Sequence, residues 1–341
     1  MAKMMAAAVV APGKVEIIER EIPVPGEGQV LVKIAACGIC TLEKRIYTGA
    51  LKIGYPLVGG HEVSGVIADL GPGIMRKLNR GDHVTLDLLN RCGECYYCRE
   101  GHSNHCVNLF KKKTGILGGM AEYVIVSSRE VFVLENQVPF PEATLTEPVA
   151  TCIHSLTQSR FSVEHTALII GAGTMGFIHL RLLKNMGIRV IVSDVDETRV
   201  KNAVKAGADL VLRADKIDVP ARVKDYTDGM GCQTVIVTSP GDQPARHALD
   251  CVAIKGTVVF YSAYYPPQML PLDLNWLHYK EVCLTGSESK TPLDFIKAVK
   301  FQNMRNLGLA PLISGRMPLA EAARAFELAM EPSSYRIILE M

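Results

Sequence analysis

Short runs of apolar and β-branched residues, separated by proline and glycine turns, fill the first third of the chain. Runs of this kind predict strands, and many short strands with tight turns are typical of a β-barrel or a sandwich. We therefore expect residues 1–150 to form one β-rich domain. The predicted strands are Ala6–Val10, Val15–Glu19, Gln29–Ala36, Gly65–Leu70, His83–Leu88, Ala121–Val126 and Val131–Leu134.

The hydrophobic pattern changes near residue 166, where apolar runs begin to alternate with amphipathic helical spacing. Thr166–Ile170 is a short apolar run, Phe177–Met186 has helical periodicity, and Ile188–Asp194 is a β-branched run that ends in an acid. Alternation of strands and helices predicts an α/β fold with a doubly wound parallel sheet, whose ligand lies at the carboxyl ends of the strands. Four further strands are predicted at Ala208–Leu212, Thr234–Thr238, Gly256–Tyr261 and Val282–Thr285, and a helix at Asp196–Gly207.

A glycine-rich fingerprint, Gly171-x-Gly173-x-x-Gly176, joins the first of these strands to its helix. The glycines permit a tight turn, a close approach of backbone to a pyrophosphate, and close packing of the helix on the strand. Asp194 would accept hydrogen bonds from adenosine ribose hydroxyls, and Asp196 adds negative charge that repels a ribose phosphate, so NAD is expected rather than NADP. Further candidate cofactor contacts are Thr174 and Met175 in the fingerprint and Ser262 and Ser287 after two strand ends.

Composition narrows the class of protein. The 341 residues suffice for two domains, and 48% hydrophobic residues allow large cores. The net charge of +2 indicates no nucleic-acid partner, and Lys111–Lys113 is expected to be a solvated loop. The apolar start Met4–Ala11 is interpreted as a strand, and no run reaches membrane-spanning length. We expect a soluble, cytoplasmic protein without a membrane partner.

Four of the ten cysteines follow the spacing Cys92-x2-Cys95-x2-Cys98-x7-Cys106 in a glycine-rich lobe of about residues 90–108. In a reducing compartment, such a spacing favours metal binding over disulfides. Four thiolates make a closed tetrahedral zinc site with no open position, which predicts a structural zinc.

A second, mixed set of ligand types is spread along the first domain. Cys37-Gly-Ile-Cys40 ends a predicted strand, and Gly60-His61-Glu62 follows 21 residues after Cys40. A thiolate, an imidazole and a carboxylate together suit Zn²⁺. The remaining thiols are interpreted as small core residues; they are Cys37, Cys152, Cys232, Cys251 and Cys283.

In order along the chain, these motifs resemble those of the zinc-dependent medium-chain alcohol and polyol dehydrogenases, especially the branch of sorbitol dehydrogenase and threonine dehydrogenase. The resemblance implies a GroES-like β-barrel catalytic domain in residues 1–150, a Rossmann NAD-binding domain in 151–288, and a segment 289–341 that returns to the first domain. That segment carries the predicted helices Pro292–Asn303 and Leu319–Met330 and the strand Tyr335–Leu339. The matching segments are Cys37–Cys40, Gly60–Glu62, the four-cysteine lobe, Gly118–Tyr123, Glu147-Pro148 and Gly171–Gly176.

The resemblance also implies roles for single residues. Cys40 and His61 would hold a catalytic zinc, while Glu62 and Glu147 are alternatives for a carboxylate that binds it directly or through water. Arg199 would stack near the adenosine.

The implied reaction is hydride transfer between NAD and the secondary alcohol of a polyol or sugar alcohol, with or without a phosphate, or of a related small hydroxy compound. An L-threonine 3-dehydrogenase activity is the alternative, and an NAD-binding protein without catalysis is a third reading. The family implies a homodimer or a homotetramer.

The chain departs from the family pattern directly after Cys40. Members usually carry a small residue, then Ser or Thr, then Asp, where this chain has Thr41-Leu42-Glu43. Leu42 replaces the hydroxyl that relays the alcohol proton, and Thr41, Tyr47 or a water beside Glu147 remain candidates for that task. Lys44 and Arg45 would suit a phosphate group on the substrate, although solvated helix charges are the commoner arrangement.

Overall fold

The computed structural model describes residues 2–51, 54–109, 118–135 and 138–341. They divide into two compact units, one formed by Met1–Ala150 with Lys290–Met341 and the other by Thr151–Ser289. The predicted loop Lys111–Lys113 lies outside the described residues. Among the described residues, no helix has the length and apolarity that crossing a bilayer would require.

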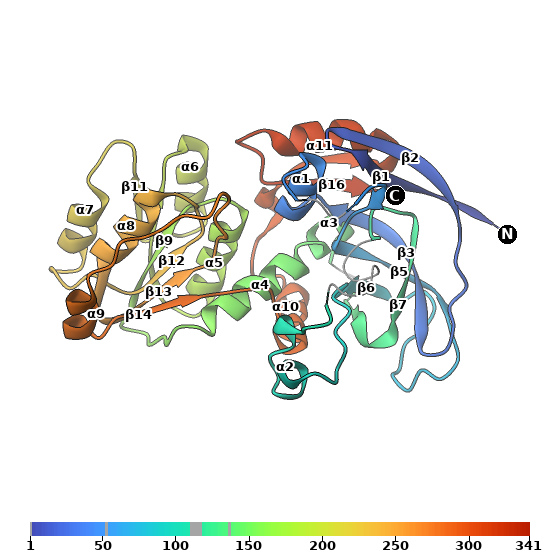
Figure 1. Cartoon of the computed structure of the whole chain (residues 1–341), viewed down its shortest axis with the longest axis horizontal. Helices are drawn as coiled ribbons and strands as arrows, with labels where there is room; N and C mark the ends of the chain where they lie inside the picture. Colours follow the sequence, from blue (N-terminus) through green and yellow to red (C-terminus); the bar gives the residue numbers. More distant parts are fainter. Residues whose placement is uncertain (1, 52–53, 110–117, 136–137) are drawn as a thin grey trace. The chain divides into compact units, whose positions relative to one another are not determined.

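The first unit is built on two sheets, drawn mainly in blue, green and red in Figure 1. A seven-stranded sheet has the order β15-β16-β3-β5-β6-β8, with β7 also paired to β3, and a three-stranded sheet has the order β2-β1-β4. The strands are β1 (Lys3–Ala11), β2 (Lys14–Glu21), β3 (Gln29–Gly38), β4 (Leu57–Val58), β5 (Glu62–Leu70), β6 (His83–Leu86), β7 (Tyr123–Ser127), β8 (Val131–Val133), β15 (Ile313–Pro318) and β16 (Arg336–Glu340).

Helices of the first unit are short, apart from those that follow residue 146. A core of buried apolar residues from β3, β5, β6 and the last helix, including Val32, Ile67, Leu86 and Phe326, holds the unit together. The α-helices are α1 (Thr41–Tyr47), α2 (Tyr96–Arg99), α3 (Phe140–Ala143), α4 (Thr146–Leu156), α10 (Pro292–Met304) and α11 (Ala322–Met330). Short 3₁₀ turns occur at Ser103–His105, Ser128–Glu130, Ala310–Leu312 and Leu319–Glu321.

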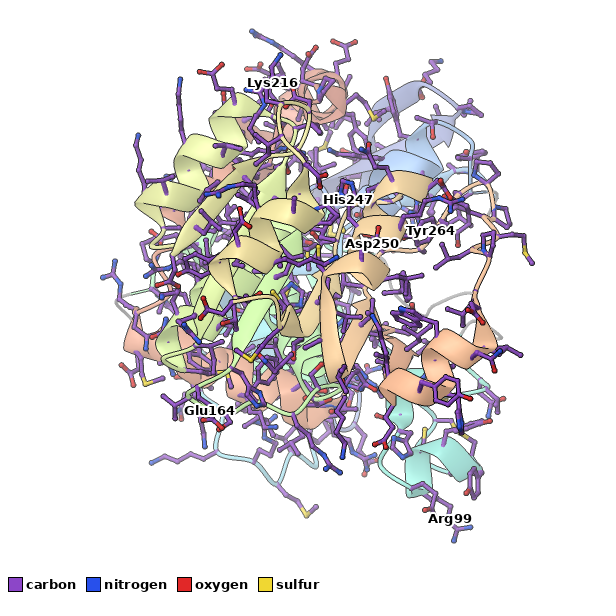
Figure 2. All side chains as sticks on the ribbon, turned by 90° about the vertical axis from the view of Figure 1, so that its left-hand side faces the viewer. Arg99, Glu164, Lys216, His247, Asp250 and Tyr264 are labelled. Carbon is purple, nitrogen blue, oxygen red and sulfur yellow. The ribbon has the colours of Figure 1, made fainter. Side chains whose placement is uncertain are left out.

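The second unit contains a six-stranded sheet of order β11-β10-β9-β12-β13-β14, and all of its strand pairs are parallel. Figure 1 shows α5 and α6 on one side of this sheet and α7 and α8 on the other, and Figure 2 marks α8 by His247 and Asp250. The predicted doubly wound α/β sheet is confirmed. The elements are β9 (Thr166–Ile170), α5 (Thr174–Asn185), β10 (Arg189–Asp194), α6 (Glu197–Lys205), β11 (Leu210–Arg213), α7 (Val219–Tyr226), β12 (Cys232–Val237), α8 (Asp242–Cys251), β13 (Val252–Phe260), α9 (Leu274–Lys280) and β14 (Cys283–Gly286).

Two expectations from the sequence were wrong in detail. Cys283 is exposed on β14, the edge strand of the parallel sheet, whereas Cys37, Cys152, Cys232 and Cys251 are buried as predicted. An edge strand has a neighbour on one side only, so its side chains need not enter the core. The helix predicted from Leu319 begins instead with a 3₁₀ turn, and α11 starts at Ala322.

Candidate functional site

Five residues with metal-ligand side chains meet in the first unit, at the ends of β3 and β5. Cys40, Glu43 and His61 form one group and His61, Glu62 and Glu147 form another, and in each group the ligand atoms lie within 4.8 Å of one another. All of these side chains are buried except that of Cys40, which is half-buried. The four residues that the resemblance assigned to a catalytic zinc are thus divided between two groups that share His61.

Strand register explains why these residues meet. In the antiparallel pair β3–β5, Gly38 lies opposite Glu62, and in the pair β16–β3, Ile338 lies opposite the same glycine. The end of β3, which leads into Cys40, is therefore flanked by the start of β5 and by the start of β16. Glu147 joins from the first turn of α4.

Glu43 is a residue of this site that the sequence analysis did not assign. Its carboxylate is 1% exposed and accepts hydrogen bonds from the backbone N–H of Cys40 and of Gly60, each 3.1 Å long, and from His61 Nδ1 at 2.8 Å. Because Nδ1 donates to Glu43, the other ring nitrogen, Nε2, is left to bind a metal. The signal in the sequence was an acid three residues after Cys40, the spacing at which a carboxylate reaches back to the start of a helix.

The contact between His61 and Glu43 shifts both pKa values. Burial alone would lower the pKa of His61, but the Glu43 charge and the hydrogen bonds to Cys40 and Glu43 raise it well above its ordinary value. Burial would raise the pKa of Glu43, and the charge and hydrogen bond of His61 outweigh this and lower it. The pair is therefore held as an imidazolium and a carboxylate until a metal displaces the proton.

Two buried cations, also unassigned from the sequence, each hold one of the other carboxylates. Arg336 Nε and Nη2 donate to the two oxygens of Glu62 at 2.7 Å each, and Nη2 also lies 3.4 Å from Cys40 Sγ. Lys290 Nζ donates to Glu147 Oε1 at 2.5 Å. Burial would raise the pKa of Glu147, but the Lys290 charge lowers it overall. Glu147 is thus kept ionised in a buried place, and each of the two carboxylates has the partner of opposite charge that a buried charge needs.

The residues fit a zinc ion by the chemistry of their donors. One thiolate, one imidazole nitrogen and one carboxylate oxygen form a three-ligand set of the kind that leaves a position for water or substrate. Cys40, His61, and Glu62 or Glu147 would supply that set.

The four-cysteine lobe forms a second cluster, and all four ligand atoms again lie within 4.8 Å of one another. Cys92 Sγ is 3.5 Å from Cys106 Sγ and 4.0 Å from Cys98 Sγ. Tetrahedral zinc with bonds of about 2.3 Å separates its sulfurs by about 3.8 Å, so the lobe has the dimensions of a closed zinc site. Among the described residues, Leu89 and Leu109 are the buried apolar side chains that pack with these cysteines.

The proposed substitutes for the proton relay lie in different surroundings. Thr41 is exposed on the first turn of α1, while Leu42 and Tyr47 pack against the apolar core of the unit. Lys44 and Arg45 are half-buried on the same helix. Of the candidate carboxylates, Glu147 is the one whose Oε2 has no hydrogen bond among the described residues.

The glycine fingerprint of the second unit has the backbone that a dinucleotide turn needs. Gly171 has a φ of +102°, and a Cβ on Gly176 would lie 1.8 Å from the Gly171 carbonyl oxygen, so both positions require glycine. The nearest side chain to a Cβ on Gly173 would be the Arg199 guanidinium, at 3.9 Å. α5 begins at Thr174.

Asp194 lies beside this turn at the end of β10. Its Oδ2 accepts from Ala172 N at 2.5 Å and its Oδ1 from Asp196 N at 2.8 Å. Asp196 in turn caps α6, because its side chain accepts from Arg199 N at 2.9 Å. Ser262 follows β13, and its hydroxyl donates to Thr238 O at 2.6 Å. Met175 is half-buried and its carbonyl accepts from His179 Nδ1 at 2.8 Å.

Comparison with known proteins agrees with this architecture. Residues 26–136 match the family described as alcohol dehydrogenase GroES-like domain, and residues 174–303 match the family described as zinc-binding dehydrogenase. D-arabitol-phosphate dehydrogenase of Enterococcus avium is 29% identical over 337 residues, 97% of this chain and 95% of that protein. L-threonine 3-dehydrogenase of Pyrococcus horikoshii is 32% identical over 279 residues, 80% of this chain and 79% of that protein.

Among solved structures, a candidate zinc-binding dehydrogenase of Sinorhizobium meliloti 1021, bound to NADP, superposes with a TM-score of 0.94 at 24% identity over the whole of both chains. A GroES-like unit with two cysteine-containing clusters that could hold a metal, next in sequence to a Rossmann-like parallel sheet, is typical of a zinc-binding dehydrogenase. The chain belongs to the zinc-dependent medium-chain dehydrogenases, the family of the alcohol, polyol and threonine dehydrogenases.

Proposed function

We propose that this protein is an NAD-dependent zinc oxidoreductase that transfers a hydride between the nicotinamide and the secondary alcohol of a polyol or sugar alcohol, with or without a phosphate. The observation that carries the proposal is a pair of candidate ligand groups that share His61, one with Cys40 and Glu43 and the other with Glu62 and Glu147. A thiolate, an imidazole and carboxylates at that spacing are what an open, catalytic zinc site uses.

The residues of the cluster have different roles in the proposed reaction. When bound there, zinc supplies Lewis-acid chemistry that favours loss of the hydroxyl proton. Cys40 and His61 would hold the ion, and the contact of Glu43 with His61 Nδ1 would leave Nε2 available to it. The alcohol loses one proton to a carboxylate and one hydride to NAD. Glu147 is suited to accept the proton directly or through water, because the Lys290 charge keeps it ionised.

The cofactor assignment rests on Asp194. Its carboxylate lies at the end of β10 next to the glycine turn, and a second acid, Asp196, lies two residues further. A ribose 2′-phosphate would meet two negative charges there, whereas ribose hydroxyls would meet hydrogen-bond acceptors. The Sinorhizobium structure contains NADP, so a direct comparison of both cofactors is required.

Relatives support two substrate classes. The relative that acts on arabitol phosphate favours a phosphorylated polyol, and Lys44 or Arg45 would then contact the phosphate. The threonine dehydrogenase of Pyrococcus horikoshii favours a β-hydroxy amino acid as the alternative. A homodimer or a homotetramer is the assembly we expect from the family.

The test is NADH or NADPH formation by the purified, zinc-replete protein. The panel contains polyols, their phosphates, simple secondary alcohols and L-threonine, each offered with NAD and with NADP. We expect turnover with NAD and one polyol class. Turnover with threonine alone would replace the polyol proposal. No turnover, with NADH still bound, would support the reading of a protein that has lost catalysis, and Leu42→Ser would then test whether the missing hydroxyl is the cause.

A further inference from the structure

Lys290, the partner of Glu147, is held at both ends. Its ammonium lies 2.5 Å from Glu147 Oε1 and 3.6 Å from Asp87 Oδ1. Its carbonyl oxygen accepts a hydrogen bond of 2.8 Å from Arg91 Nη2, and Arg91 Nη1 donates to Asp87 Oδ2 at 2.7 Å. Asp87 and Arg91 therefore close a ring of contacts around Lys290 that includes its main chain as well as its charge.

These four residues form a buried charge group, which consists of Asp87, Arg91, Glu147 and Lys290. The side chain of each is at most 9% exposed. The group contains two cations and two anions, so its charges balance. Removal of one member leaves a buried charge without its counter-charge, which is costly. The position of each side chain in the group therefore depends on the other three.

Arg91 connects this charge group to the four-cysteine lobe. It directly precedes Cys92, whose backbone N–H donates to Cys106 Sγ at 3.4 Å. The N–H of Arg91 donates to the Leu89 carbonyl oxygen at 3.0 Å, and Leu89 packs against the lobe cysteines. A change in the conformation of the lobe would therefore displace the guanidinium that holds Lys290.

We propose that Asp87 and Arg91 are positioning residues for Glu147 and that they link it to the state of the four-cysteine lobe. Arg91 holds the main chain of Lys290, and Asp87 holds its ammonium. Lys290 in turn orients the Glu147 carboxylate. A lobe that is closed around its metal keeps Arg91 in place, and a lobe that has lost the metal releases it. The inference rests on the proposed function, in which Glu147 accepts the substrate proton.

Acetylation of Lys290 in the zinc-replete protein tests the ring without any turnover. Acetic anhydride is the probe, and mass spectrometry of peptides gives the rate at each lysine. Arg91→Gln should raise the rate at Lys290 by about tenfold or more, because the buried ring no longer has to break before the amine is exposed. Cys98→Ser, which removes one ligand of the lobe, should have the same effect. The rate at Lys297, which lies on α10 directly after Lys290 and its cap, should stay the same.

Two further variants serve as controls for this measurement. Arg80→Gln removes another Arg–Asp pair of the first unit, that of Arg80 with Asp69, whose side chains are 69% and 39% exposed, and it should leave Lys290 protected. Arg91→Lys keeps the positive charge but lacks the planar fork, so it should give an intermediate rate, and it tests the ring even if Arg91→Gln does not fold.

The labelling results can overturn each part of the proposal. An unchanged rate at Lys290 in the Arg91 variants would show that the ring does not hold this lysine. A raised rate in those variants, with none in Cys98→Ser after metal analysis shows the loss of one zinc, would show that the lobe is not linked to it.

Kinetics test the consequence for Glu147, with NAD and the alcohol of the panel that is turned over fastest. In Arg91→Gln we expect kcat to fall by about tenfold or more, because a displaced carboxylate accepts the proton less well, while the KM for NAD is unchanged. Arg91→Lys should recover part of the loss. A raised labelling rate with an unchanged kcat would overturn the positioning role and would place the error in the proposed function of Glu147, whereas an unchanged labelling rate places it in the ring.

Discussion

The two candidate metal-binding clusters of the first unit differ in where their residues come from in the chain. The four-cysteine cluster takes all of its ligands from the segment between Cys92 and Cys106, and its apolar surroundings are two leucines. The mixed cluster gathers residues from across the unit, and Arg336 lies 296 positions after Cys40 in the chain. The four-cysteine cluster is therefore formed by one short loop. The mixed cluster forms only when strands from both ends of the chain pair.

The two clusters also differ in the groups that stabilise their charges. In the lobe, backbone N–H groups and neighbouring side chains hold the pKa of the Cys92 thiol down to about 6, while burial raises that of Cys98 to about 12. In the mixed cluster, the charges are balanced by buried side chains of opposite sign. We therefore expect a metal to organise the lobe, whereas the fold organises the side chains of the mixed cluster without one.

The largest expected effect follows from Cys40→Ala at the mixed cluster. We expect turnover to fall by at least about a thousandfold, because the several kcal/mol that a metal contributes to the barrier are lost. NADH binding, measured by fluorescence titration, should be unchanged. Full turnover in this variant would show that Cys40 holds no catalytic metal.

Cys98→Ser tests the lobe in the same protein. Zinc content should fall by one ion per chain, and a loss of about 3 kcal/mol would lower the Tm by about 10 °C. Thermal unfolding and metal analysis measure both. Cys283→Ser is the matched control, because Cys283 is an exposed thiol outside both clusters. An unaltered zinc content in Cys98→Ser would show that the lobe binds no zinc.

Glu43→Gln tests whether the mixed cluster is organised in advance. Without the carboxylate that orients His61, the affinity of the mixed cluster for zinc should fall by about 10- to 100-fold, while the lobe keeps its ion. Competition with a chelator separates the two sites. Equal loss from both would mean that the clusters are not independent.

The same pair gives a pH signature in the metal-free protein. The pKa of His61 is raised, so its contribution to stability is complete below pH 6.5 and is lost as pH rises through the folded pKa. The pKa of Glu43 is lowered, so its contribution is complete above pH 4.5 and is lost as pH falls through the folded pKa. Relative to Glu43→Gln, the wild-type urea midpoint should be highest between pH 4.5 and 6.5. A constant difference across pH would contradict the charged pair.

Asp194→Ala has the smallest expected effect. It extends the comparison to the second unit, whose candidate cofactor site lies beside the glycine fingerprint. Loss of the ribose acceptors should reduce the preference for NAD over NADP by about tenfold, since a hydrogen bond to a charged group contributes about 1.5 kcal/mol or more. The ratio of kcat/KM for the two cofactors measures this. An unchanged ratio would exclude Asp194 from cofactor selection.

Much of this architecture could be predicted from the sequence, because it depends on local patterns. Short β-branched and apolar runs between proline and glycine turns predicted the β-rich part, and strand–helix alternation around Gly171 predicted the parallel sheet, which the structure confirms. The motifs also led to the family, which comparison with known proteins confirms. Cys283 was predicted wrongly because hydrophobicity of a run does not tell a central strand from an edge strand.

Glu43, Arg336 and Lys290 show what could not be predicted. Each is a charged residue, a type that is mostly exposed, and Arg336 and Lys290 belong to no motif recognised in advance. Each is buried beside a partner of opposite charge: Glu43 beside His61, Lys290 beside Glu147 and Arg336 beside Glu62.

The sequence by itself determined the fold class, the family, the four-cysteine spacing and the glycine turn, since periodicity and spacing act within a few residues. Only the tertiary structure decided which charged residues pair in the mixed cluster. Strand register places Gly38 opposite both Glu62 and Ile338, and this brings Arg336 to Glu62. Lys290, which lies just before α10, reaches Glu147 in the folded chain. Pairing of buried charges depends on distances through space, and those distances follow from strand register rather than from neighbours in the chain.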